Sequence, residues 1–152
     1  MATTATSSET HIVVGVDGSG ASIRALQWAG RVGGALDVPL LAVMAWEYPA
    51  MYGASGMGMT EWRPDVDAKQ ALIDALEAAF GDHRPAGLQS DVRQGHPAKV
   101  MLDAADRAEM LVLGSRGHGG FVGLLIGSVS ARCAELATCP VVVVHDKSDE
   151  QN

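Results

Sequence analysis

The residues best suited to bind an anion form a glycine-rich segment that follows a short apolar run at residues 110–113. The segment reads Gly-Ser-Arg-Gly-His-Gly-Gly over residues 114–120, and a Gly-Ser pair follows at residues 127 and 128. Glycines permit backbone conformations in which consecutive N–H groups converge on an anion. A helix that starts at the Gly-Ser pair would add unpaired N–H groups and the positive end of its dipole. We therefore expect this segment to bind the phosphates of a nucleotide, the alternative being an ordinary strand-to-helix loop.

Three side chains in or near the expected phosphate-binding segment carry a charge or can acquire one. Asp17 follows the apolar run at residues 11–16, and a carboxylate beside phosphates would accept ribose hydroxyls or hold Mg²⁺. Its alternative role is that of a helix cap or turn residue. Arg116 and His118 are the basic side chains of the glycine-rich segment. A guanidinium suits bidentate phosphate contacts, so we expect one from Arg116 more than from His118, the alternative being that both are solvated.

Several named motifs are absent. Gly15 and Gly20 have the glycine spacing of a P-loop, but Ala21 stands where the lysine is required. The dinucleotide fingerprint does not follow the first apolar run, and no nucleophile elbow is present. The five histidines do not pair at metal-binding intervals with carboxylates or cysteines.

The net charge, the apolar runs and the cysteines of the chain argue against several kinds of partner and site. The net charge of −7 argues against nucleic acid and against an anionic membrane. No apolar run reaches about 18 residues, so we expect no membrane span, and residues 1–10 lack the pattern of a secretory signal. Cys133 and Cys139 have no metal-ligand spacing and are expected to be reduced thiols of a cytoplasmic protein.

Strand-like and helix-like stretches alternate between two tails, at residues 1–10 and 147–152, that we expect to be disordered. The single domain between them, residues 11–146, contains five short strands, expected at residues 11–16, 39–46, 87–93, 110–113 and 141–144. Helices are expected at 22–36, from 64 onward, from 97 onward and at 128–137. This alternation predicts an α/β fold with a parallel, doubly wound sheet. Ligands of such sheets bind beyond the carboxyl ends of the strands, where the strand order reverses.

Two helices are assigned inward faces from their apolar spacing. In the helix from residue 64 we expect a shared buried face made by Leu72, Ile73, Leu76, Ala79 and Phe80, and in the last helix by Val129, Cys133 and Leu136. Residues 47–63, rich in Met, Gly and aromatic side chains, show no clear period. A run of this length is either a plain connection or a loop that covers a binding site.

The glycine-rich segment also carries a family resemblance. Gly114-x-x-Gly117, nine residues, then Gly127-Ser128 resembles the nucleotide-binding signature of universal stress proteins, in particular their ATP-binding branch. Similarity to the family extends to residues 12–19, 95–97 and 139–144, so that it covers about residues 11–146 in order.

The resemblance implies a Rossmann-like fold of the adenine nucleotide alpha hydrolase type, with a five-stranded parallel sheet of order 3-2-1-4-5 and helices on both faces. It places Asp17 at the ribose and metal side of the nucleotide and the backbone of Val43 against adenine, although Val43 also fits the core. Together with the chemistry above, it assigns nucleotide-binding roles to Gly15, Val16, Asp17, Val43, Gly114, Ser115, Arg116, Gly117, His118, Gly119, Gly120, Gly127, Ser128, Val129 and Ser130.

The function implied is that of a stress-response regulator that binds ATP with Mg²⁺ or Mn²⁺. Cyclic AMP or AMP is the alternative ligand. We expect binding rather than turnover, with slow ATP hydrolysis as the competing hypothesis, because the segment has no lysine and no second acidic metal ligand is evident in the sequence. Family members pair through the last strand, here Val141, Val142, Val143 and Val144, and an apolar edge of this kind is best covered by a second copy.

Overall fold

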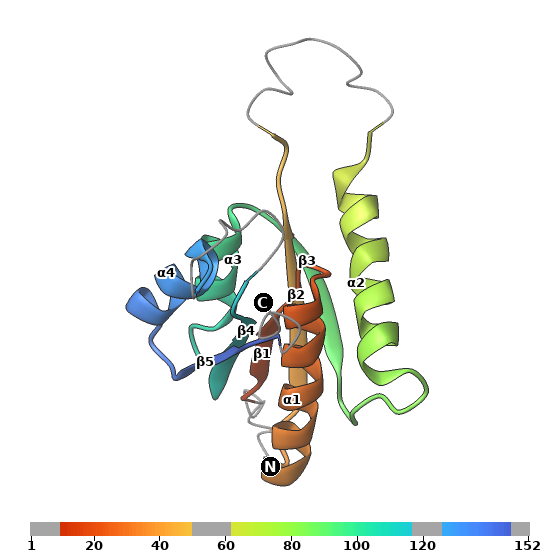
Figure 1. Cartoon of the computed structure of the whole chain (residues 1–152), viewed down its shortest axis with the longest axis vertical. Coiled ribbons are helices and arrows are strands. Elements are labelled where there is room, and N and C mark those ends of the chain that lie inside the picture. Colours follow the sequence, from red (N-terminus) through yellow and green to blue (C-terminus); the bar gives the residue numbers. More distant parts are fainter. Residues whose placement is uncertain (1–9, 50–61, 117–125, 147–152) are drawn as a thin grey trace, which may run out of the picture.

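The computed structural model of this chain describes residues 10–49, 62–116 and 126–146. Strands and helices alternate along the chain (Figure 1) in the order β1 (Ile12–Gly15), α1 (Gly20–Leu36), β2 (Leu40–Trp46), α2 (Pro64–Phe80), β3 (Gln89–Gln94), α3 (Pro97–Ala104), β4 (Met110–Gly114), α4 (Ser128–Leu136) and β5 (Val141–Val144). These are the expected elements, and their ends differ by at most two residues from the sequence-based limits where both ends were given. The expected tails fall almost entirely outside the described residues.

All five strands run parallel in one sheet of order β3-β2-β1-β4-β5, which confirms the expected order 3-2-1-4-5. Gly15 of β1 pairs with Val43 of β2, and Val14 pairs with Val112 of β4. The chain therefore leaves β1 toward one side of the sheet and later returns to its other side. The reversal places a switch point between the carboxyl ends of β1 and β4, where sheets of this kind hold ligands.

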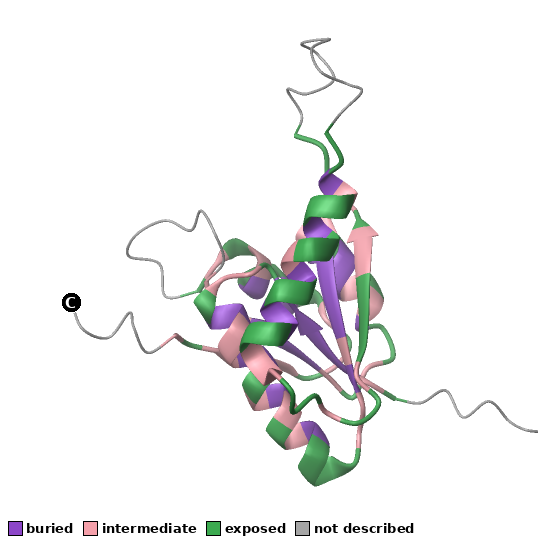
Figure 2. Cartoon of the chain, turned by 90° about the vertical axis from the view of Figure 1, so that its right-hand side faces the viewer, coloured by how far each residue is buried: buried purple, intermediate pink, exposed green. Residues whose placement is uncertain are grey.

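Helices cover both faces of the sheet, as expected for a doubly wound fold. α1 and α2 pack on one face, where Leu26 and Leu72 join Val14 and Ala42 in one apolar cluster. α3 and α4 pack on the other face, where Met101 and Cys133 join Val43 and Leu111. Figure 2 shows the buried residues concentrated in the sheet and on the helix sides that face it. Burial of each such Leu or Val contributes roughly 1.5–3 kcal/mol, so these two clusters hold the layers together.

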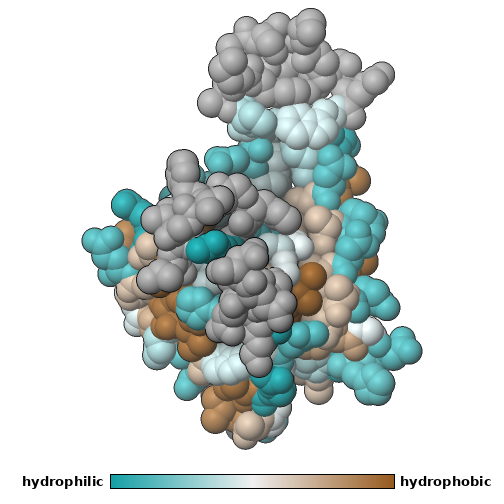
Figure 3. Space-filling model, in the orientation of Figure 1, coloured by the Kyte–Doolittle hydropathy of each residue, from teal (hydrophilic) through white to brown (hydrophobic). Residues whose placement is uncertain are grey.

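Two side chains expected inside are at the surface. Ile73 of α2 is 45% exposed and Leu136 of α4 is 49% exposed. The buried side of α2 is a narrow stripe that passes through Ala68, Leu72 and Leu76, and Ile73 lies about 100° around the helix from Leu72. Leu136 is the last residue of α4, where the helix has little left to pack against. Most of the surface along α2, at the right-hand margin of Figure 3, is hydrophilic.

The two edge strands of the sheet differ in character. β3 is mostly exposed and polar, and its Arg93 guanidinium lies 2.7 Å from the Asp91 carboxylate. β5 consists of four half-buried valines. Within the described part of the chain, no helix is both long and apolar enough to cross a bilayer. Cys133 is buried, Cys139 is half-buried, and both are free thiols whose pKa is raised by burial.

Candidate functional site

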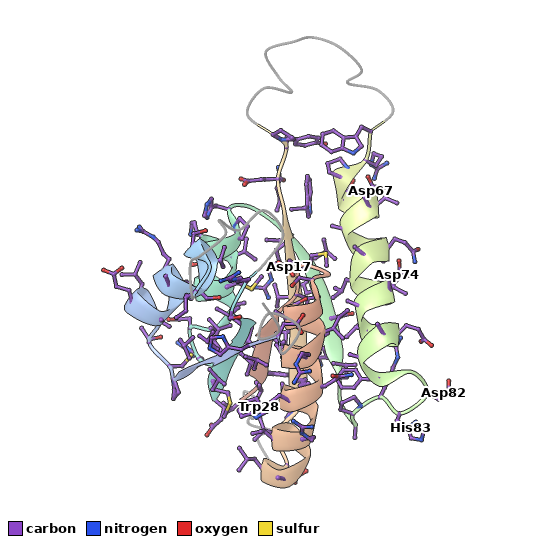
Figure 4. The ribbon with its side chains drawn as sticks, in the orientation of Figure 1. Asp17, Trp28, Asp67, Asp74, Asp82 and His83 are labelled. Atoms are coloured by element: carbon purple, nitrogen blue, oxygen red, sulfur yellow. The ribbon has the colours of Figure 1, made fainter. Side chains whose placement is uncertain are left out.

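The carboxyl ends of β1 and β4 meet the first turns of α1 and α4 at one edge of the sheet. Beyond the end of β1, the Val16 N–H donates to the Val43 carbonyl at 2.9 Å. Beyond the end of β4, the Ser115 N–H donates to the Val144 carbonyl at 2.8 Å. Figure 4 labels Asp17 at the start of α1, in this junction. The structure thus brings the described members of the expected site to the predicted switch point.

Among the described residues, the buried polar side chains are three serines, and all three lie in this junction: Ser22, Ser115 and Ser130. The Ser22 hydroxyl donates to the Ser19 carbonyl at 2.9 Å, and the Ser130 hydroxyl donates to the Gly114 carbonyl at 2.7 Å. A hydroxyl buried without a partner is costly. The bond from Ser130 ties the start of α4 to the end of β4, whereas the bond from Ser22 stays within the first turn of α1. The Ser130 hydroxyl proton is therefore used within the protein.

The glycine-rich segment is closed at its base. The Gly127 N–H donates to the Ser115 carbonyl at 2.6 Å, which joins the end of β4 to the start of α4. Both anchoring residues are among those expected to bind nucleotide. Four others, Gly117, His118, Gly119 and Gly120, lie outside the described residues.

Two of the expected site glycines are required by packing. A Cβ atom on Gly114 would lie 2.8 Å from the Cβ and carbonyl carbon of Ala21 and 2.9 Å from the Ser22 nitrogen. A Cβ atom on Gly15 would overlap the Leu113 side chain and lie 3.1 Å from the Met101 sulfur. These glycines therefore allow α1 and α3 to approach the strands.

Asp17 takes the turn role that was its alternative assignment. Its carboxylate accepts the Ser19 N–H at 2.9 Å, and its own N–H donates to the Ser22 hydroxyl at 3.4 Å. The cap of α1 is Ser19, whose hydroxyl oxygen accepts the Ser22 N–H at 3.2 Å. Asp17 is nevertheless exposed at the carboxyl edge, so the turn orients its carboxylate without burying it.

Val16 and Val43 are buried near the carboxyl ends of β1 and β2, in the two apolar clusters on opposite faces of the sheet. Val16 is 3% exposed and Val43 is fully buried. The Val43 carbonyl is already bonded to the Val16 N–H. Val43 therefore serves the core, which was the other role given to it, and a contact of its backbone with adenine stays a prediction.

The start of α4 is built differently from that of α1. Its cap residue is Gly127, and among the described residues no side chain makes a capping hydrogen bond there. Ser128 is exposed, Val129 is half-buried, and the Gly127 carbonyl accepts the first helical bond, from the Ala131 N–H at 3.0 Å. N–H groups in the first turn of such a helix have no partner within the helix itself and can bind an anion.

Arg116 and Asp146 complete the charged groups that the structure places at the junction. Arg116 is half-buried, and its carbonyl accepts a bond from the Ser19 hydroxyl at 3.4 Å. Asp146, two residues after β5, brings a carboxylate oxygen to within 2.5 Å of where a Cβ on Gly20 would stand. Ser19, directly before α1, is of a residue type that commonly caps helices, and this signal in the sequence could have identified the cap. No local signal points to Asp146, because its contact joins opposite ends of the chain.

Aromatic rings pack against one another at the two ends of the stretch at residues 47–63. The Trp46 and Tyr48 ring centroids are 5.4 Å apart and those of Tyr48 and Trp62 6.0 Å apart, both edge-to-face. The Trp62 indole N–H donates to Asp67 at 3.2 Å. Residues 50–61 lie outside the described part of the chain, so their role as a cover for the site stays a prediction.

A groove of about 800 Å³ lies at the opposite, amino edge of the sheet, between the ends of α1 and α2. Gly34 and Phe80 contribute to its lining, and its charged members, Arg31, Asp37 and His83, are exposed. It contains none of the three buried serines. The described residues also hold no group of three His, Cys, Asp or Glu side chains that could bind a metal ion. We therefore place the candidate site at the carboxyl edge.

Comparison with known proteins gives the relatives of this chain. The profile of the Universal stress protein family matches residues 9–145. Universal stress protein Rv2623 of Mycobacterium tuberculosis is 32% identical over 142 residues, which cover 89% of this chain and 45% of the relative. The chain spans about half the length of the curated relatives that it matches first.

Two similar solved structures contain adenine nucleotides. One is a universal stress protein in complex with cAMP, 25% identical, with a TM-score of 0.67, covering 90% of this chain and 97% of that one. The other is the universal stress protein from Archaeoglobus fulgidus in complex with dAMP, 25% identical, with a TM-score of 0.61, covering 89% and 97%.

Proposed function

This chain belongs to the universal stress protein family, and on that premise we propose that it is an adenine-nucleotide-binding regulator of the stress response. It acts by holding its ligand and changing the surfaces that it offers to partners, and at most it hydrolyses ATP slowly. A nucleotide-dependent role of this kind belongs in the cytoplasm, where adenine nucleotides are held.

One observation carries the proposal. The amino end of α4 has no side-chain cap among the described residues, lies at the switch point of the sheet, and is anchored by Gly127 to Ser115, the residue after β4. Phosphate oxygens are suitable acceptors for the N–H groups of such a helix start. α1 begins at the same edge, but its first turn is already supplied with acceptors by the protein.

The expected residues divide into three roles. The phosphates would bind the segment from Gly114 to Gly120 and the first turn of α4, from Gly127 to Ser130, with Arg116 adding charge. The ribose would meet Asp17, and adenine would lie toward Val16 and Val43. A carboxylate together with phosphate oxygens is a donor set that suits Mg²⁺ or Mn²⁺, and Asp17, exposed and oriented by its turn, would hold that ion. The ion would neutralise the charge of a triphosphate.

ATP with a divalent ion is the first candidate ligand. Cyclic AMP or AMP is the second, and the observation that favours it is that relatives were crystallised with cAMP and dAMP. Both candidates use the same junction.

The ligand can be identified directly. The purified chain is denatured and the released nucleotide is identified by mass spectrometry, and ATP, AMP and cyclic AMP are then titrated by calorimetry. Micromolar binding of an adenine nucleotide supports the proposal, whereas no binding of any of the three contradicts it. ADP release far above that of an Asp17→Ala variant would instead favour an enzyme.

The proposal includes a homodimer formed through Val141–Val144. The half-buried valines of β5 leave an apolar edge that a second copy can pair with across a two-fold axis. Sedimentation at micromolar concentration tests this. A monomer at all concentrations would contradict the pairing without affecting the nucleotide site.

A further inference from the structure

We propose that the groove at the amino edge of the sheet is a second binding site, which takes a short peptide of about three residues with both termini free. The groove lies between the ends of α1 and α2, and all the residues that line it belong to the described part of the chain. It is at the opposite edge of the sheet from the candidate nucleotide site, so peptide binding here does not depend on the proposed function.

Two opposite charges stand at the groove, and α1 supplies both. Arg31 is exposed in the second half of the helix, and Asp37 is the exposed residue at which the helix ends. Within the described part of the chain, neither side chain joins an ion pair. A guanidinium is a bidentate partner for a carboxylate, and a carboxylate is a partner for an ammonium group. The groove therefore matches a ligand that carries a negative charge at one end and a positive charge at the other.

The end of α1 adds to the attraction for a positive charge. Asp37 has a left-handed backbone (φ 58°), and its N–H donates to the Gly33 carbonyl. The Val38 N–H donates to the same carbonyl at 2.9 Å, which fixes the turn that ends the helix. The later carbonyls of α1 have no partner within the helix and form the negative end of its dipole. An ammonium group at this end would therefore meet the Asp37 carboxylate and these carbonyls together.

The spacing of the two charges sets the length of the ligand. Asp37 follows Arg31 by six residues, and a helix rises about 1.5 Å per residue, so the two residues lie about 9 Å apart along the axis. An extended peptide advances at most about 3.3–3.6 Å per residue. The terminal charges of a peptide of about three residues can therefore reach both partners, whereas the adjacent charges of a free amino acid can reach only one.

Apolar side chains from the opposite wall give the middle of the ligand a surface to pack on. The Phe80 ring lies against α1, where a Cβ atom on Gly30 would be 2.9 Å from it and 3.5 Å from Pro85. Both side chains are half-buried, so each keeps an accessible part at the groove. His83, on the loop that follows α2 (Figure 4), adds a ring nitrogen that can bond to a peptide group.

Gly34 keeps the α1 wall of the groove open. A Cβ atom on Gly33 would lie 2.6 Å from Leu40, so packing explains that glycine. A Cβ atom on Gly34 would meet nothing within 4 Å. Since a glycine inside a helix lowers stability relative to alanine, packing does not explain Gly34. A larger side chain at this position would fill the groove without disturbing the fold.

The test is calorimetric titration of the full chain with the tripeptide Ala-Leu-Ala and with its N-acetylated and C-amidated forms. We expect the free tripeptide to bind. Each blocked form should bind about tenfold more weakly, because it loses one of the two charge-assisted contacts.

Three substitutions examine the groove from the side of the protein. Arg31→Gln and Asp37→Asn each remove one charge, and asparagine tolerates the left-handed conformation of residue 37. Each should weaken binding of the free tripeptide about tenfold. Arg31→Gln should leave the affinity for the C-amidated form unchanged, and Asp37→Asn that for the N-acetylated form, because the contact is already absent. Gly34→Leu fills the groove and should weaken all three peptides about tenfold or more.

Arg107→Gln and Ala35→Leu are the matched controls, since both positions are exposed and lie outside the groove. Both should leave peptide binding unchanged. Thermal unfolding of Gly34→Leu should occur at no lower temperature than that of the unaltered chain, because leucine is a better helix former than glycine.

No binding of the free tripeptide at millimolar concentration would overturn the inference. Equal binding of the free and blocked forms would overturn the matching of charges. If only one terminus mattered, the groove would suit the end of a protein chain, and the inference of a free short peptide would be wrong. Binding that Gly34→Leu leaves unchanged would place the peptide elsewhere and also overturn it. None of these outcomes alters nucleotide binding, which is measured separately.

Discussion

α1 and α4 begin at the same edge of the sheet, α1 after the turn that follows β1 and α4 after the longer glycine-rich stretch that follows β4, yet their cap residues differ. At α1 the protein supplies its own acceptors: the Ser19 hydroxyl caps the helix, and the Asp146 carboxylate lies against its first residue. At α4 the cap residue is Gly127, which has no side chain to offer. The contrast separates a helix start that a serine side chain caps from one whose cap residue has no side chain, which is where we propose that phosphate binds.

The largest effect is expected where the two helix starts are joined. Gly114→Ala would place a Cβ 2.8 Å from backbone and side-chain atoms of Ala21, so α1 must move away from β4. We expect the free energy of unfolding to fall by about 2 kcal/mol, as measured by urea denaturation. Gly34→Ala is the matched control, because a Cβ there meets nothing within 4 Å. It should raise stability by about 0.5–1 kcal/mol, and equal effects of the two changes would refute the packing role of Gly114.

A smaller effect tests whether the open start of α4 is reserved for a ligand. Gly127→Ser should give α4 a side-chain cap, because Gly127 has the extended backbone (φ −70°, ψ 163°) of an ordinary cap residue. We expect the free energy of unfolding to rise by a few tenths of a kcal/mol. Nucleotide affinity should fall about tenfold, because the new hydroxyl would accept hydrogen bonds from the same backbone N–H groups of α4 that would otherwise bind the phosphate. Calorimetry measures the affinity. An unchanged affinity in a stabilised variant would remove α4 from the site.

The smallest effect is expected at the start of α1, where the Ser19 side chain already caps the helix. Ser19→Ala should lower stability by about 1 kcal/mol, because the Ser22 N–H loses its acceptor. At α4, Ser128→Ala in the first residue of the helix removes an exposed hydroxyl and should stay within about 0.5 kcal/mol. Thermal unfolding of both variants gives the comparison. A larger loss at Ser128 than at Ser19 would reverse the distinction between the two helices.

The fold was largely predictable because its strands carry their own signal. Continuous apolar runs such as Ile12–Gly15 and Val141–Val144 indicate strands of a covered parallel sheet, and their alternation with helices leaves few topologies. The strand order came from the family resemblance. Apolar spacing failed at Ile73 and Leu136, because periodicity identifies a helix face but not how much of it a neighbour covers.

The site was predictable in type and less so in its details. Glycines and serines around residues 114 and 127 indicate an anion-binding segment, since the chemistry is local to the chain. The buried hydrogen bond from Ser130 to Gly114 and the approach of Asp146 to Gly20 depend on distant parts of the chain meeting. Gly15 and Gly114 were expected to face a ligand, and packing accounts for the absence of their side chains.

The unequal edges of the sheet bear on how far copies of this chain can assemble. A strand edge that pairs with another strand can continue indefinitely only if the far edge pairs as well. β5 ends the sheet on one side with half-buried valines. β3 ends it on the other side with mostly exposed polar residues and the charges of Asp91 and Arg93. If β5 pairs with a second copy as proposed, growth of the sheet would stop at two chains, because the polar edge at β3 offers no matching apolar strand.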